Sequence, residues 1–216
     1  MASYAETAGM ATDTEPVGLL TEGAAGIAAI VLSIIALAGV SSPALASITA
    51  IVIGVGLMVQ AFNTAAEGLR LPQVGGVAEF GGEVMVDCLG GGAGVVLGVL
   101  ALIGLSSAYL LAAALIVFGG ALLLSGALSM RTRVMATGPS GQLISIPGFA
   151  ATGSVELLMG MAAIVLGILA LVLGGTHTAI LLLVGFITVG AALLIVSATF
   201  GAALMRVFAR SGIAAE

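Results

Sequence analysis

Six long apolar runs, arranged in pairs, constrain this chain more than any other feature of its sequence. The runs are 23–40 with 44–62, 89–105 with 109–128, and 157–173 with 179–204. A helix needs about 20 apolar residues to cross a bilayer, and about 17–25 are sufficient. Only a few residues separate the two runs of each pair, so their helices are expected to be antiparallel neighbours. The sequence therefore predicts an all-α polytopic membrane protein with six transmembrane helices.

The composition supports the same class. Only 7% of the 216 residues are charged and 61% are hydrophobic, whereas an ordinary globular domain is about 25% charged. The net charge of −5 argues against binding to nucleic acid, because neutralising phosphates requires clusters of lysine and arginine. The single cysteine, Cys88, excludes a disulfide framework.

The three pairs of runs resemble one another. Segments 30–37, 95–102 and 164–171 share the pattern Ile/Val-Val-Leu-Ser/Gly-Ile/Val-Ile/Leu-Ala-Leu. In the second runs, the corresponding glycines are Gly54, Gly119 and Gly190. Each copy contains two helices, so all three copies cross the membrane in the same sense. We expect three tandem helical-hairpin repeats around a pseudo-threefold axis along the membrane normal.

The repeats divide the chain into seven segments. We expect a polar N-terminal tail, three hairpins that alternate with two loops, and a short C-terminal tail. Their bounds are 1–18 for the first tail, 19–70, 87–133 and 155–206 for the hairpins, 71–86 and 134–154 for the loops, and 207–216 for the last tail.

The arginines indicate an orientation in the membrane. All five follow the second run of a pair, and none lies near a hairpin tip: Arg70, Arg131, Arg133, Arg206 and Arg210. Arginine and lysine near helix ends favour the cytoplasmic side. We therefore expect a multi-pass protein of the cell (inner, cytoplasmic) membrane, with both termini and both loops in the cytoplasm.

A carboxylate precedes the first run of each pair: Glu22, Asp87 and Glu156. One interpretation is a ring of acids that attracts cations or relays protons, as in cation channels. The other is structural: an acid in the first helical turn is stabilised by the helix dipole and pairs with an arginine at the end of the returning helix. The candidate arginine partners are Arg70, Arg131, Arg133 and Arg206.

Small residues at four-residue spacing mark one face of each first helix. They are Ala25, Ala29 and Ser33 in the first copy, Gly90, Gly94 and Gly98 in the second, and Ala163 and Gly167, after Met159, in the third. In lipid, small residues allow close helix contact and drive association by dispersion. This face can pack the six helices inside one chain or join subunits of a homo-oligomer.

No group of residues resembles an active site. A Ser–His–Asp triad would need an interior histidine, and the only one, His177, lies at a predicted tip. Neither a zinc-protease spacing nor a phosphate-binding loop occurs. We expect no catalytic residues, no cofactor and no metal.

The repeated Gly-x(3)-Ile/Val-Val-Leu-Gly-Ile/Val-Leu-Ala-Leu, a short tip and a returning Gly-Ala-Leu-Leu resemble the HdeD-like family of small six-helix membrane proteins. The resemblance covers about residues 19–206. It implies a tandem hairpin repeat and, because the type member is associated with acid resistance, a stress-related role. The chain departs from the family pattern in having no tryptophan and a proline, Pro43, at only one tip.

Together these features predict a non-enzymatic structural or stress-related membrane protein. It would contact lipid and assemble with itself or with a larger membrane complex through the small-residue helix faces. The alternative is a small cation or proton channel or transporter that uses Glu22, Asp87 and Glu156.

Overall fold

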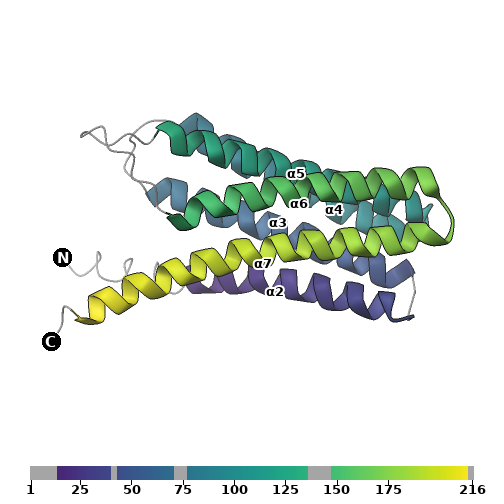
Figure 1. The fold of residues 1–216 in the computed structure, drawn as a ribbon, viewed down its shortest axis with the longest axis horizontal. Coiled ribbons are helices and arrows are strands. Elements are labelled where there is room, and N and C mark those ends of the chain that lie inside the picture. Colours follow the sequence, from purple (N-terminus) through teal and green to yellow (C-terminus); the bar gives the residue numbers. More distant parts are fainter. Residues whose placement is uncertain (1–13, 40–42, 71–76, 136–146, 214–216) are drawn as a thin grey trace.

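The described residues form an elongated bundle of six helices and contain no strand. The computed structural model describes residues 14–39, 43–70, 77–135 and 147–213. The helices are α2 (Thr14–Leu37), α3 (Pro43–Arg70), α4 (Val77–Leu102), α5 (Ser107–Met135), α6 (Pro147–Leu173) and α7 (Thr176–Ile213). They run along the long axis of the bundle, and successive helices have opposite directions (Figure 1).

The tips at one end of the bundle are formed by glycines in the left-handed region. Gly104 has a φ of 94°, and its N–H donates to the carbonyl of Ala101. The next N–H, of Leu105, donates to the carbonyl of Leu100 at 3.3 Å. These two bonds are a Schellman motif, which ends α4 and satisfies two of its last carbonyls. The ends of α2 and α6 also have glycines with positive φ, Gly39 and Gly174.

Three helices are inner and three are outer. The inner helices α3, α5 and α7 all contact one another. The outer helices α2, α4 and α6 contact only inner helices within the part of the chain that the structure describes. Around the bundle the order is α2, α3, α4, α5, α6 and α7, and contact between α7 and α2 closes the ring.

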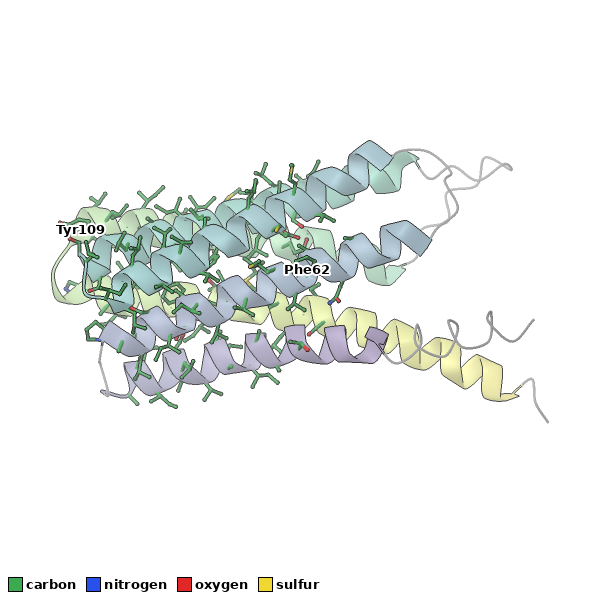
Figure 2. The ribbon with its side chains drawn as sticks, turned by 180° about the vertical axis from the view of Figure 1, so that it is seen from behind. Phe62 and Tyr109 are labelled. Atoms are coloured by element: carbon green, nitrogen blue, oxygen red, sulfur yellow. The ribbon has the colours of Figure 1, made fainter. Side chains whose placement is uncertain are left out.

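The exterior of the bundle is apolar. Large side chains such as Leu89, Leu158 and Val172 are 68%, 69% and 79% exposed, and Figure 2 shows Phe62 and Tyr109 on the surface as well. Five helices contain apolar stretches of 19–22 residues: Pro43–Asn63, Val84–Leu102, Ser107–Leu128, Gly153–Leu173 and His177–Ala198. In α2 the described apolar stretch, Gly23–Leu37, is shorter. Such helices fit a multi-pass membrane protein in contact with lipid.

The helices extend beyond the apolar runs that predict them. Helix α4 begins at Val77 and α6 at Pro147, inside the predicted loops 71–86 and 134–154. The predicted tails also contribute helix, because α2 begins at Thr14 and α7 ends at Ile213. Helical hydrogen bonds are made within the backbone and need no apolar side chains, so hydropathy marks the membrane-embedded part of each helix and not its ends. Residues 71–76 and 136–146 lie outside the described residues.

Candidate functional site

Two of the three predicted acids are buried inside the bundle. Asp87 of α4 has no exposed surface and Glu156 of α6 is 5% exposed. The Oγ of Ser125, on α5, donates a hydrogen bond of 3.3 Å to Oδ2 of Asp87. Burying a carboxylate is unfavourable unless hydrogen bonds or opposite charges compensate for its lost water. The hydrogen bond from Ser125 is one such compensating contact inside the bundle.

The acids do not lie in the first turns of their helices, as the dipole interpretation requires. Helix α4 begins at Val77 and α6 at Pro147, so more than two helical turns precede Asp87 and Glu156. The interaction of a charge with the helix dipole falls off within the first turn. The dipole therefore does not account for these carboxylates.

Glu156 packs against the same part of α5 as Asp87 does. A methyl group on Gly126 would lie 3.2 Å from Cβ of Glu156 and 2.8 Å from the carbonyl oxygen of Gly153. Gly126 directly follows Ser125, the hydrogen-bond donor to Asp87. The two outer helices α4 and α6 thus each place an acidic residue beside one of two consecutive residues of the inner helix α5.

The third acid, Glu22, belongs to α2, but its side chain lies outside the described residues. Its neighbour Gly23 is close to α7, because a methyl group there would lie 3.1 Å from Oγ of Ser197. By repeat register, Ser197 occupies the position of Gly126. The backbone of α2 therefore approaches α7 at this level as that of α6 approaches α5.

Buried polar residues of the inner helices were missing from the predicted site. Ser125 has no exposed surface, and Gln60 of α3 is 6% exposed. The repeat register places them at the same position of the second helix. Aligning the second helices for polar residues, as well as for glycines, would have found both. The two are therefore candidate partners of the carboxylates that enter from the outer helices.

The predicted arginine partners lie at the same end of the bundle as the starts of α2, α4 and α6 (Figure 1). Arg70 ends α3, Arg131 and Arg133 belong to the last turns of α5, and Arg206 belongs to the last part of α7. Their side chains lie outside the described residues, so acid–arginine pairs stay a prediction. Among the described residues, no three His, Cys, Asp or Glu side chains cluster closely enough to hold a metal ion.

The small-residue face of α4 is filled by neighbouring helices of the same chain. A methyl group on Gly90 would lie 2.5 Å from Cβ of Ala121, and one on Gly94 would overlap the ring of Phe118. Gly98 instead faces α3, and a methyl group on it would lie 2.8 Å from Cγ1 of Ile51.

The corresponding faces of α2 and α6 are also inside the bundle. Ala29, Ser33 and Ala163 have no exposed surface. A methyl group on Gly167 would lie 2.7 Å from Cγ1 of Ile116, and the Cβ of Ala25 approaches Gly56 of α3. A second copy of the chain has no access to these faces, so any assembly must use other surfaces.

Comparison with models of protein families, with curated proteins and with solved structures gives no match. The fold and its apolar exterior are those expected of an integral, multi-pass membrane protein. The resemblance to the HdeD-like family stays a prediction.

Proposed function

We propose that the protein binds and transfers protons or small cations through its buried carboxylates. The observation that carries this proposal is the burial of Asp87, which has no exposed surface and accepts a hydrogen bond from Ser125. Ionisable side chains inside a membrane bundle are costly, and they typically mark ion pathways and proton relays. The proposal takes both termini to be cytoplasmic, by the positive-inside rule.

The proposed architecture is three tandem hairpins around a pseudo-threefold axis. Its support is a contact between glycines that recurs at equivalent sequence positions wherever an outer helix meets the inner helix of another pair. At each contact, a methyl group on either glycine would lie 2.5–3.1 Å from the carbonyl oxygen of the other. The pairs are Gly26 with Gly190, Gly91 with Gly54, and Gly160 with Gly119.

The positions of the acids suit uptake from one side of the membrane. Asp87 and Glu156 lie two residues and one residue before the apolar runs 89–105 and 157–173, and both are buried. They are therefore inside the bundle, next to the ends of these runs that are far from the tips. A carboxylate at this depth can take a proton from the aqueous side and exchange it with a neighbouring hydroxyl or acid.

Buried hydroxyls extend the polar interior towards the tips. Ser47 and Thr49, near the start of α3, have no exposed surface. Each hydroxyl donates to a carbonyl four residues earlier in its own helix, at 2.9 Å to Pro43 and 2.8 Å to Leu45. A hydroxyl oxygen that donates in this way also has lone pairs that can accept. These two hydroxyls are the proposed proton-accepting groups of the pathway at the tip end.

Reconstitution into liposomes tests the proposal directly. The purified protein is placed in vesicles with an internal pH dye, and proton, sodium or potassium gradients are applied in turn. We expect wild-type flux above that of empty vesicles, and a loss of at least tenfold, the scale of a positioned proton-transfer group, in Asp87→Asn combined with Glu156→Gln. The matched control is Asp13→Asn combined with Glu216→Gln, which also removes two carboxylates, both outside the apolar runs of the sequence, and should keep wild-type flux. Absence of flux in every gradient would refute the proposal.

A structural or stress-related role is the second candidate function. It is favoured by the resemblance to the HdeD-like family and by the close helix contacts at Gly54 and Gly119, where a methyl group would lie 2.7 and 2.6 Å from a facing carbonyl oxygen. Such a protein would reinforce the membrane or anchor a complex through its exposed apolar surface. A defined oligomer or a reproducible partner in native membranes, together with no ion flux, would favour this candidate.

A further inference from the structure

Three seams join an outer helix to an inner helix through facing glycines, and one seam is more open than the others. In the α3–α4 and α5–α6 seams, a methyl group on either glycine would lie 2.5–2.7 Å from the opposite carbonyl oxygen. In the α2–α7 seam the same distances are 2.8 Å for Gly26 and 3.1 Å for Gly190. The backbones of α2 and α7 are therefore further apart at the equivalent contact.

The residues two turns closer to the tips explain the difference. In the two closer seams a methyl group on the glycine at this level, Gly98 or Gly167, would lie 2.8 or 2.7 Å from Cγ1 of an isoleucine, Ile51 or Ile116. It would also lie 3.2 Å from the carbonyl oxygen of a small residue, Ser47 or Ala112. The positions that correspond by repeat register in the α2–α7 seam are Ser33 and Leu183, and both are buried. Larger side chains at this level hold the helix backbones apart.

Ser33 also makes the closed seam less favourable. Its Oγ is completely buried and has no hydrogen-bond partner among the described residues. A buried hydroxyl without a partner loses its bonds to water and receives nothing in exchange. Separation of α2 from α7 would allow water or a lipid headgroup to reach this oxygen. The same hydroxyl has no counterpart in the other two seams, where the residue is glycine.

We propose that the bundle opens at the α2–α7 seam while the α3–α4 and α5–α6 seams stay closed. Opening moves α2 away from α7 near the tips and connects the interior of the bundle laterally to the bilayer. The proposal concerns the packing of the helices, and it holds whether or not the carboxylates carry ions.

Distance measurements between pairs of spin labels test the proposal. Labels are attached to cysteines in a Cys88→Ala background, in lipid nanodiscs. The test pair is Ile34→Cys with Val184→Cys across α2–α7, and the matched control is Val99→Cys with Ile48→Cys, at equivalent positions across α3–α4. All four residues are exposed. We expect a second, longer distance in the test pair and one narrow distance in the control. Equal distributions in both pairs would overturn the proposal.

A single substitution tests the cause of the opening. Ser33→Ala removes the hydroxyl without a partner and keeps the Cβ. We expect the ratio of open to closed molecules in the test pair to fall by a factor of roughly 5–30, the change produced by one unfavourable buried polar group. An unchanged ratio would overturn the role of Ser33. Hydrogen–deuterium exchange on the unlabelled protein gives a second measurement, in which α2 should exchange faster than α4 and α6; equal rates would overturn the proposal.

Discussion

Gly91 and Gly92 are adjacent residues of α4 whose substitution by alanine should have opposite effects. A methyl group on Gly91 would lie 2.5 Å from the carbonyl oxygen of Gly54, 2.9 Å from Cγ of Met58 and 3.0 Å from its backbone nitrogen. Two of these atoms are backbone and cannot rotate away. Ordinary contact begins at 3.4 Å, so α3 and α4 must separate by almost 1 Å. A methyl group on Gly92 would have no atom of another helix within 4 Å.

The difference between the two variants isolates the steric effect. Each substitution raises the free energy of unfolding by about 1 kcal/mol, because alanine has a higher helix propensity than glycine. Only Gly91→Ala carries the cost of overpacking, which is about 1–3 kcal/mol. We therefore expect Gly91→Ala to unfold at least ~1 kcal/mol more easily than Gly92→Ala, while Gly92→Ala is as stable as the wild type or more stable.

The single cysteine provides the assay. Cys88 is half-buried in α4, so its labelling by a thiol-reactive dye should accelerate as added SDS opens the bundle in mixed micelles. The SDS concentration at half-maximal labelling gives the relative stability of each variant. Equal midpoints for Gly91→Ala and Gly92→Ala would refute the packing of α3 against α4 at this level.

Three further predictions concern other positions. Ser125→Ala removes the hydroxyl that donates to Asp87 and should cost about 1–3 kcal/mol by the same assay; no change would mean that the carboxylate is satisfied without it. Gly104→Ala places a Cβ at a φ of 94° and should cost about 1 kcal/mol, whereas Gly120→Ala, with open space around it, should cost nothing. Thr178→Val removes a bond from Oγ1 to the carbonyl of Ala170 and should cost about 0.6 kcal/mol; a cost above about 2 kcal/mol would contradict a single interhelical bond.

Helix number and the positions of the tips could be predicted from the sequence because hydropathy and glycine act locally. Each apolar run corresponds to one helix, and Gly39, Gly104 and Gly174 end the first helices with positive φ. The helix starts could not be predicted in the same way. Residues 77–83 are helical although they precede the apolar run, and this extension removes Asp87 from the first turn.

The partners of the small-residue face also depend on tertiary structure. Gly90 and Gly94 face α5, but Gly98 faces α3. Residues four apart advance by about 40° around the helix axis, since each residue turns by about 100°. Over two such steps a stripe of small residues winds from one neighbouring helix to the next. The spacing predicts a packing face, but only the arrangement of the whole bundle assigns its partners.

The closed ring has a consequence for the connectivity of the chain. Helices α2 and α7 are neighbours, and the start of α2 lies at the same end of the bundle as the end of α7 (Figure 1). A linker could therefore join the start of α2 to the end of α7, and new termini could be opened between α3 and α4 without reversing any helix. In such a circular permutant, a covalent connection would span the α2–α7 contact, and the tight contact at Gly54 and Gly91 would have to close without one.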